Sequence, residues 1–534
     1  RPDDRGPAPR RPDDRSGARG PDRGFERGPD RGFDRGFDRG PDRRGPPTGR
    51  GPDRSAQGGR PRPFDDDRAP IRPVRRDLRP VLFMPCAMGV EPLLVEELTP
   101  LLAALKLQVL EEKGGVLVRS AEGDGRAPID LAFDLGSPLA ATLIEACALV
   151  NLHSRLAQRV LWRVAFGPYS TEDQLYQLGR CVIWPEWMRV DQTLRVDVTA
   201  RHSPLKSLNF AALRIKDAVC DSLREELGER PDVDTRHPDL PLHLHLDGQA
   251  AHLYVDTSGE ALFKRGWRED KGEAPLKETL AAAMLAAAGW KGREGDGTLL
   301  DPCCGSGTIA IEAAQIACGI APGLQRRFAF EKLLPFQPHL ARWQQLRQQA
   351  RAQQHPPRVR IVTGDVSFRM TDFATRNAER AGVLHAIEFK TADALQRPAP
   401  DETGVMMFNP PYGERIDPKG TGAGGRTTAL SADAEQAPRA PRAPREDFID
   451  RDASDFFQRL SSHWKKQYSG WTAWVLSPDM KLPSAMRLKE SRRVVMFNGP
   501  IECRLFRFDL VKGSLRNDAP AAAPASDNSA STDD

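Results

Sequence analysis

Residues 298–308 read Thr-Leu-Leu-Asp-Pro-Cys-Cys-Gly-Ser-Gly-Thr. Their apolar start predicts a short buried strand, and the alanine- and isoleucine-rich residues 308–318 predict a helix. The glycines between them permit backbone conformations that other residues avoid, and they let a ligand approach the main chain closely. In a doubly wound α/β fold, a loop of this kind lies at the carboxyl edge of the sheet, where ligands bind. The candidate ligand-binding residues of this loop are Asp301, Pro302, Gly305 and Gly307.

Strands and helices alternate from residue 263 to residue 513, on both sides of this loop. The strands expected after residue 301 are 358–362, 387–389, 405–408, 471–476 and 503–511, and a further helix is expected at 368–381. Consecutive strand–helix units imply a mainly parallel, doubly wound sheet, so this part is predicted to be a Rossmann-like α/β domain. Residues 417–446 are rich in Gly, Ala and Pro and predict a disordered surface insertion, and residues 514–534 predict a disordered tail.

A second module precedes this domain. Strands are expected at 81–84, 115–118, 159–164, 194–198, 242–246 and 251–255, and helices at 91–105, 140–149 and 209–227. Mixed elements of this kind indicate an α+β fold, which we divide into a small subdomain at 80–129 and a second domain at 130–257. His243 and His245 share one face of an expected strand. Because no third ligand is apparent, an exposed strand face explains them better than a metal site.

The first 79 residues differ in composition from the rest of the chain. Residues 1–80 contain 22 arginines, 15 acidic residues and no lysine, whereas the remainder has 56 basic and 59 acidic residues. Because they have few apolar side chains to bury, residues 1–79 are predicted to be a disordered arm. Arginine–glycine repeats with interspersed phenylalanines favour weak, sequence-independent contact with RNA, although a solvated tail that binds nothing explains the same composition.

Residues 408–413, Phe-Asn-Pro-Pro-Tyr-Gly, follow an apolar strand and carry the most specific chemical signal. The two prolines donate no amide hydrogen, which leaves carbonyl oxygens available as acceptors. The side-chain oxygen of Asn409 and the carbonyl of Pro410 can accept both hydrogens of a flat NH₂ group, and Tyr412 offers a ring on which a base can stack. An aromatic amine is a poor nucleophile, so alignment with a methyl sulfonium donor is what such a loop can supply. The candidate catalytic residues are Asn409, Pro410, Pro411 and Tyr412.

Two acidic residues follow neighbouring strands of the expected sheet. Asp365 comes after the strand at 358–362, and Asp393 after the strand at 387–389. In a doubly wound sheet, an acid after the second strand commonly binds a ribose diol, and one after the third can meet an adenine amino group. A turn or a helix cap explains either aspartate alone equally well. Their position between the glycine loop and Asn409 makes both of them candidate cofactor ligands.

These motifs allow other interpretations. The spacing Gly305-x-Gly307-x-x-Ala310 also satisfies a dinucleotide-binding pattern, so a nicotinamide-dependent oxidoreductase is one alternative, and a non-catalytic RNA-binding protein is another. A flat amine also occurs in adenine of DNA and in glutamine of a protein. Cys303 and Cys304 lack a neighbouring base motif and are interpreted as packing residues. Glu312 is expected either to touch a cofactor or to favour the helix dipole.

Composition argues against several classes of protein. No run of about 18 apolar residues occurs, which argues against a membrane-spanning helix. The first residues lack the apolar core of a secretory signal. Eight cysteines without a Cys-x-x-Cys pair indicate neither a disulfide scaffold nor a structural zinc site. We therefore expect a cytoplasmic protein that uses no metal.

Residues 81–513 resemble the THUMP-domain class I RNA methyltransferases, of the RlmL type that methylates guanine N2 in 23S rRNA. The most specific matches are residues 301–308 and 409–415, and further matches are Val95-Glu96-Glu97-Leu98, Val233-Asp234, 264–268, 274–282, Asn498-Gly499-Pro500 and Cys503-Arg504. The resemblance implies an RNA-binding THUMP domain at about 130–257 and a class I methyltransferase domain at 263–513. It also implies 23S rRNA or a ribosome-assembly intermediate as the partner, with tRNA and adenine N6 as alternatives.

The same resemblance implies S-adenosylmethionine as the cofactor. It places cofactor binding on Asp301, Gly305, Gly307, Asp365 and Asp393, and the target amine on Asn409, Pro410 and Tyr412. Two features depart from the family pattern: Asp365-Val366-Ser367 replaces two acids separated by one residue, and the insertion after Arg415 is long. Some relatives carry a second methyltransferase domain, for which this chain is expected to be too short.

Overall fold

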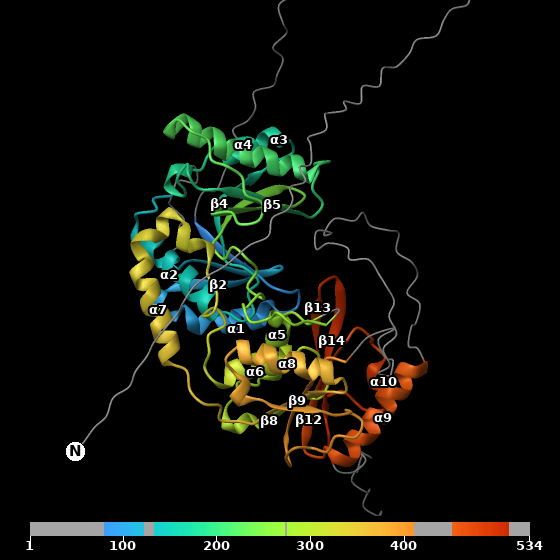
Figure 1. Cartoon of the computed structure of the whole chain (residues 1–534). Coiled ribbons are helices and arrows are strands. Elements are labelled where there is room, and N and C mark those ends of the chain that lie inside the picture. Colours follow the sequence, from blue (N-terminus) through green and yellow to red (C-terminus); the bar gives the residue numbers. More distant parts are fainter. Residues whose placement is uncertain (1–79, 122–132, 273–274, 411–450, 512–534) are drawn as a thin grey trace, which may run out of the picture. The chain divides into compact units, whose positions relative to one another are not determined.

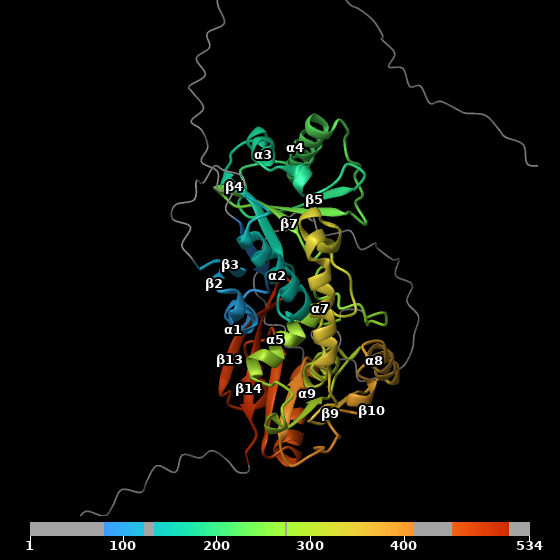
Figure 2. The same cartoon turned by 90° about the vertical axis from the view of Figure 1, so that its left-hand side faces the viewer.

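The computed structural model describes residues 80–121, 133–272, 275–410 and 451–511 (Figures 1 and 2). The predicted arm, the insertion at 417–446 and the tail at 514–534 lie outside these described residues. The described part contains two seven-stranded sheets, one formed by the N-terminal strands and one by the C-terminal strands.

The first sheet has the strand order β2-β3-β1-β4-β7-β6-β5. Its strands are β1 (Val81–Pro85), β2 (Leu107–Glu112), β3 (Gly115–Ser120), β4 (Leu161–Pro168), β5 (Leu194–Ala200), β6 (Leu240–Leu246) and β7 (Ala250–Asp256). Strand β1 pairs antiparallel with both β3 and β4. The segments that we divided at residue 129 therefore contribute strands to one sheet.

Helices bury one face of this sheet. They are α1 (Glu91–Leu101), α2 (Pro138–His153), α3 (Glu172–Gly179) and α4 (Leu208–Leu227). In Figures 1 and 2, α3 and α4 lie together beside β4 and β5. Thr171 and Gln174 form a capping box at the start of α3, and Gly228 ends α4 with a φ of 86°. Apolar side chains between these helices and the sheet form a buried core that includes Trp162 and Trp184.

The second sheet has the strand order β10-β9-β8-β11-β12-β14-β13. Its strands are β8 (Thr298–Asp301), β9 (Ile361–Asp365), β10 (Glu388–Thr391), β11 (Gly404–Phe408), β12 (Trp471–Ser477), β13 (Arg492–Asn498) and β14 (Ile501–Asp509). Its helices are α5 (Glu278–Ala288), α6 (Thr308–Ala317), α8 (Phe368–Arg380), α9 (Arg451–Gln467) and α10 (Leu482–Met486). Helix α7 (Leu340–Ala352) lies in the same half of the sequence but packs against α2 of the N-terminal module (Figures 1 and 2). In sheet order, the five strands β10, β9, β8, β11 and β12 are parallel to one another, and β14 is antiparallel to its neighbours β12 and β13. This topology confirms the predicted Rossmann-like α/β domain.

Short 3₁₀ helices connect these elements. They are η1 (Ala103–Leu105), η2 (Trp184–Glu186), η3 (Glu294–Asp296), η4 (Ala329–Lys332), η5 (Leu334–His339) and η6 (Leu384–Ala386). None of the described helices combines the length and the apolar character that a membrane span requires.

Some elements differ from the sequence-based predictions. Gly364 and Asp365 belong to β9 itself, because that strand begins later than the expected 358–362. The predictions also lacked the strands β2 and β13 and the helices α3, α5, α7, α9 and α10. Strand β2 is the edge of its sheet, and none of its residues is buried, so no clear alternation marks it. Helix α7 is largely polar, and only Trp343, Leu346 and Ala350 of its residues are buried.

Candidate active site at the edge of the second sheet

The chain reverses its direction of progress across the second sheet between β8 and β11. From β8 it proceeds outward to β9 and β10, then returns to β11 on the other side of β8. Leu300 of β8 pairs with Met406 of β11. Asp301, the last residue of β8, and Asn409, the first residue after β11, therefore leave the same carboxyl edge of the sheet. In folds of this type, ligands bind in the crevice at such a switch point.

The glycine loop is held against β9 by its own backbone. The Cys304 amide donates to the Gly364 carbonyl at 2.8 Å, and the Gly305 amide donates to Oδ2 of Asp365 at 3.0 Å. Gly305 has a φ of 53°, and a Cβ at this position would meet no atom within 4 Å. Gly305 thus borders open space that a ligand can occupy.

Gly307 meets a different requirement. It has a φ of 87°, and a Cβ there would lie 2.9 Å from the Cβ of Ala374 in α8. Side chains essentially never approach this closely, so glycine at 307 permits α6 and α8 to pack together. Cofactor binding by Gly307 stays a prediction, because the structure accounts for this glycine through packing.

Asp301 is a buried acid whose carboxylate oxygens both lack a hydrogen-bond partner among the described residues. Burial, together with the charge of Asp365, raises the pKa of Asp301 to about 8. The Cys303 amide and the Arg397 guanidinium lower this pKa, although neither lies in hydrogen-bonding geometry with the carboxylate. A buried acceptor without a partner costs free energy, so a ligand that brings a cationic donor fits this position.

The two later aspartates lie along the same edge. Asp365 is half-buried and accepts hydrogen bonds from the amides of Gly305 and Ser367, and burial raises its pKa. Asp393 accepts from the Leu395 amide at 2.8 Å and from Nε2 of Gln396 at 3.1 Å. The structure thus gives Asp393 a turn-capping role, and ligand binding by either aspartate stays a prediction.

The Asn409 loop is described at its start. Asn409 is half-buried and Pro410 is buried, and they directly follow β11. Pro411 and Tyr412 lie outside the described residues. The structure therefore brings the Asn409 backbone to the edge that Asp301 and Gly305 share.

Sequence reasoning assigned no role to Arg268, which lies in the segment that joins the two modules. Its Nη1 donates to Oγ of Ser306 at 2.7 Å, and its Nη2 donates to Oγ1 of Thr308 at 2.8 Å. Its Nε donates to the buried Glu278 at 2.7 Å. One guanidinium thus holds the glycine loop, the first residue of α6 and the start of α5. The only available signal was the match of residues 264–268 to a family motif.

Asn377 is a second residue without an earlier assignment, and it is fully buried in α8. Its Nδ2 donates to the carbonyls of Ser306 at 3.0 Å and Asp270 at 2.8 Å. Its Oδ1 accepts from the amides of Glu269 and Asp270. Asn377 therefore fastens the joining segment and the glycine loop to the same helix.

Glu312 lies one turn into α6 but is engaged elsewhere. Its carboxylate is fully buried and accepts from Nε of Arg265 at 3.0 Å and from Nη1 of Arg155 at 3.2 Å. Arg265 also donates to the Arg155 carbonyl at 2.7 Å. Both carboxylate oxygens thus form a buried junction between the N-terminal module and the second sheet. Glu312, which the sequence predicts to touch a cofactor or to favour the helix dipole, forms an ion-pair triad with Arg265 and Arg155.

The remaining candidates keep their structural interpretations. No group of three metal-ligating side chains occurs in the described part of the chain. Thr199 Oγ1 lies 3.0 Å from Nε2 of His243 and 2.9 Å from Nδ1 of His245, so these histidines contact a neighbouring strand. Burial raises the pKa of the Cys303 and Cys304 thiols well above the ordinary value, which disfavours the reactive thiolate at either position.

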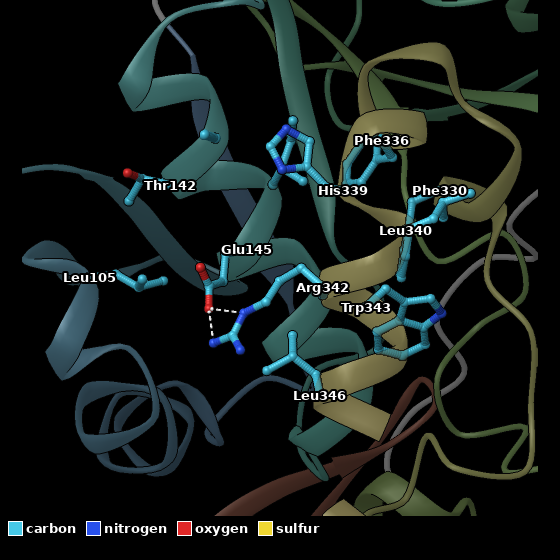
Figure 3. Close-up of a pocket in the computed structure, with 13 residues that line it drawn as sticks. Leu105, Thr142, Glu145, Phe330, Phe336, His339, Leu340, Arg342, Trp343 and Leu346 are labelled. Atoms are coloured by element: carbon cyan, nitrogen blue, oxygen red, sulfur yellow. Dashed lines mark hydrogen bonds and ion pairs between the residues drawn. The ribbon is translucent and has the colours of Figure 1, made fainter. Parts of the chain in front are cut away.

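A cavity of about 180 Å³ lies between α2 and α7, away from this edge (Figure 3). An ion pair between Glu145 and Arg342, 2.7 Å long, joins the two helices beside it. The other lining residues are mainly apolar, and none belongs to the loops after β8, β9, β10 or β11. The cavity is therefore separate from the candidate active site.

Two family models match the chain. A THUMP domain matches residues 169–256, and an RMKL-like methyltransferase domain matches residues 265–424. The ribosomal RNA large subunit methyltransferase K/L of Shewanella baltica (strain OS185) is 36% identical over 377 residues, which is 70% of this chain and 48% of that protein. The chain thus spans about half the length of the curated relatives that it matches.

Solved structures share the fold over most of the chain. The structure of SMU.472 in complex with SAH has a TM-score of 0.63 at 24% identity and covers 82% of this chain and all of that one. A predicted N6-adenine-specific DNA methylase from Listeria monocytogenes has a TM-score of 0.61 at 26% identity, covering 80% of this chain and 95% of that one. The chain therefore contains a region similar to a THUMP domain, followed by a region similar to an RMKL-like methyltransferase domain.

Proposed function

We propose that this protein transfers the methyl group of S-adenosylmethionine to the exocyclic 2-amino group of a guanine in 23S rRNA. The observation that carries the proposal is the shared sheet edge: an unpartnered buried carboxylate at Asp301 and the Asn409–Pro410 segment follow two adjacent parallel strands. The homology to rRNA methyltransferases K/L supports RNA as the substrate and 23S rRNA as its source.

The residues at this edge fit the cofactor. Asp301 offers a buried acceptor for a cationic amine, and Gly305 borders free space next to it. Asp365 retains acceptor capacity for a ribose hydroxyl, since each of its oxygens has accepted one amide. Bound S-adenosylmethionine would supply a methyl group that its sulfonium already activates. The protein therefore needs to align the target amine with this methyl group and to exclude water, rather than to generate a strong nucleophile.

The Asn409 loop holds the target nitrogen in this proposal. The Asn409 side-chain oxygen and the Pro410 carbonyl accept the two hydrogens of the amine, which favours a pyramidal nitrogen with an available lone pair. The amine acquires a positive charge on methylation and then releases a proton readily, so no strong general base is required. The target base must leave its stack to reach the loop, at a cost of a few kcal/mol.

The test uses the full chain, labelled S-adenosylmethionine, and 23S rRNA from cells that lack this protein. Digestion to nucleosides and mass spectrometry should reveal N2-methylguanine. Detection of N6-methyladenine instead would show that the target base is adenine rather than guanine. Equal labelling of tRNA would show that the substrate is not restricted to 23S rRNA. Asn409→Ala should abolish transfer while SAH binding, measured by calorimetry, stays within about twofold of wild type. Methylation of RNA at the normal rate by this variant would refute the role of the loop.

The setting of the reaction follows from the same proposal. A protein that acts on rRNA or on a ribosome-assembly intermediate works in the cytoplasm, without a metal and without a membrane. Comparing free 23S rRNA with large-subunit assembly particles as substrates would identify which of the two the protein modifies.

A further inference from the structure

The face of the first sheet opposite its helices carries a row of rings. Along β4, β7, β6 and β5 the side chains alternate, and the core side presents residues such as Leu253 and Leu244. On the other side, Phe166 pairs with His252, His252 with His245, and His245 with Thr199. We call Phe166, His252 and His245 the ring row. All three are half-buried, so each keeps part of its surface open to solvent.

The ring row is a packed unit rather than three isolated side chains. The ring centroids of Phe166 and His252 are 4.6 Å apart, and those of His252 and His245 are 5.9 Å apart. Tyr254 lies next to His252 on the same strand face, 6.1 Å away and within 8° of parallel. Packing of this kind fixes the orientation of each ring, so a flat ligand meets a surface that is ordered before it binds.

The histidines of this face are neutral rings at physiological pH. Burial and the nearby charge of Arg163 lower the pKa of His252 to about 4, against the opposing effect of Asp247. Burial also lowers the pKa of His245. Neutral rings are poor partners for an acidic side chain but good stacking partners for a nucleobase. They therefore favour an aromatic, uncharged contact over an ionic one.

Unpaired cations border the same end of the sheet. The Arg201 amide donates to the Leu246 carbonyl at 2.7 Å, which extends the β5–β6 ladder past Thr199. Tyr169 fixes the following loop, because its hydroxyl lies 2.8 Å from both Ser203 Oγ and the Asp247 carbonyl. Arg201 and Lys206 in this loop are exposed, and no described acidic side chain pairs with either.

The cations of α4 provide a contrast. Arg214 pairs with Asp173 at 2.7 Å, Lys216 with Asp217 at 2.8 Å and Arg224 with Asp221 at 3.2 Å, so local acids neutralise them. The uncompensated positive charge thus lies in the loop beside the ring row, not on the polar side of the helix.

We propose that the ring row and the adjoining Arg201–Lys206 loop bind an unpaired stretch of the RNA substrate. Bases stack on His252 and His245 and beside Phe166, over which the Arg163 guanidinium lies 5.2 Å from the ring centroid, while phosphates meet Arg201 and Lys206. A duplex fits this surface less well, because its bases are stacked inside and only phosphates and 2′-hydroxyls are accessible. This inference deepens the proposed function, since it specifies how the N-terminal module would recognise the RNA.

The test measures RNA binding without cofactor, so that it does not depend on methyl transfer. The full chain is titrated against a fluorescent oligoadenylate of about 12 nucleotides, at roughly 50 and 200 mM salt. Phe166→Leu combined with His252→Leu should weaken binding about tenfold, whereas the ring-retaining pair Phe166→Tyr and His252→Phe should bind like wild type. If the leucine variant melts at the same temperature as wild type, its loss of RNA affinity reflects the changed surface rather than unfolding.

The cations have a matched control. Arg201→Gln combined with Lys206→Gln should lower the salt dependence of log affinity by roughly 1.4, because about two phosphate contacts disappear. Lys216→Gln, which removes an ion-paired cation of α4, should leave both affinity and slope unchanged. Because every variant retains residues 1–79, any RNA binding by the arm is common to all of them.

Photo-crosslinking locates the bound strand directly. An oligonucleotide with 4-thiouridine should crosslink to peptides that contain Phe166, His245 or His252. Crosslinks confined to residues 1–79, wild-type affinity in the leucine variants, equal affinity for a duplex, or preferential binding of an acidic peptide would each overturn the proposal. If the protein binds the oligonucleotide as described but transfers no methyl group, the proposed function fails and this surface stands.

Discussion

Arg268 donates a 2.7 Å hydrogen bond to Oγ of Ser306, and so ties the segment between the two modules to the glycine loop of the candidate active site. This contact is part-buried, and the same guanidinium also reaches Thr308 and Glu278. The glycine loop of the candidate active site is therefore fixed from outside its own strand–helix unit.

Ser306→Ala tests this contact while it leaves the Arg268–Glu278 pair intact. Loss of a charge-assisted hydrogen bond should weaken SAH binding by roughly 1.5 kcal/mol, or about tenfold, because the loop gains freedom that binding must remove. Calorimetry measures the affinity. Ser462→Ala is the matched control, since that hydroxyl donates to the Gln458 carbonyl at an exposed position of α9, and the change should have no effect. Equal SAH affinity in Ser306→Ala and wild type would refute the positioning role.

Asp301 should make stability fall as pH rises. Its folded pKa of about 8 lies above the unfolded value of about 3.9, so the native state holds a proton that the unfolded state releases. The stabilisation that this proton provides is complete below about pH 4 and is lost between about pH 4 and pH 8. Asp301→Asn should therefore raise the melting temperature at pH 9 by at least about 2 °C more than at pH 5. The same shift at both pH values would contradict the raised pKa.

The same titration should control ligand affinity. If the ionised Asp301 carboxylate binds the amino group of the ligand, SAH affinity should rise about tenfold or more between pH 6 and pH 8. The rise reflects deprotonation of Asp301, because the ligand amine stays charged over this range. Asp301→Asn should bind weakly and without this pH dependence. A wild-type affinity that is flat across the range would show that Asp301 does not meet the amine.

The two glycines of the loop should respond differently to alanine. Gly305→Ala meets open space, so its cost to folding should be limited to the positive φ, about 1–2 kcal/mol, while SAH affinity falls because the Cβ enters the ligand space. Gly307→Ala adds a clash with Ala374 and should destabilise the protein by roughly 1–3 kcal/mol more. Denaturant melts and calorimetry separate the two effects. If Gly305→Ala proved less stable than Gly307→Ala, the open surroundings of Gly305 and the tight packing of Gly307 against Ala374 would be contradicted.

Glu312 should matter for stability rather than for ligand binding. Glu312→Gln leaves the buried Arg265 without its full charge partner, and disruption of such a pair typically costs about 3–5 kcal/mol. Glu145→Gln, which breaks the exposed pair with Arg342, should cost less than about 1 kcal/mol. SAH affinity, measured below the melting transition, should be unchanged in both variants. A selective loss of SAH binding in Glu312→Gln would restore the cofactor contact that we first expected.

Local sequence determined the elements around the site. Apolar runs at 298–300 and 405–408, with proline or glycine shortly after each, predicted strands that end in loops, and the structure has β8 and β11 there. Once the strands are parallel and adjacent, their ends must share an edge, so the proximity of the Asp301 and Asn409 backbones was predictable. The limits of α4 were predicted to within one residue, since the helix expected at 209–227 spans Leu208–Leu227.

Tertiary structure alone decided the partners across the chain. Glu312 meets Arg155, which is 157 residues away, and no periodicity along α6 distinguishes that contact from a cofactor contact. Gly307 accommodates Ala374 of another helix, and Arg268 reaches Ser306 from a joining segment without regular structure. Strand β1 unites the two N-terminal segments because it pairs with both β3 and β4. Local patterns report which face of an element is buried, whereas the identity of the residue opposite is set only when the chain closes on itself and hydrogen bonds form between distant segments.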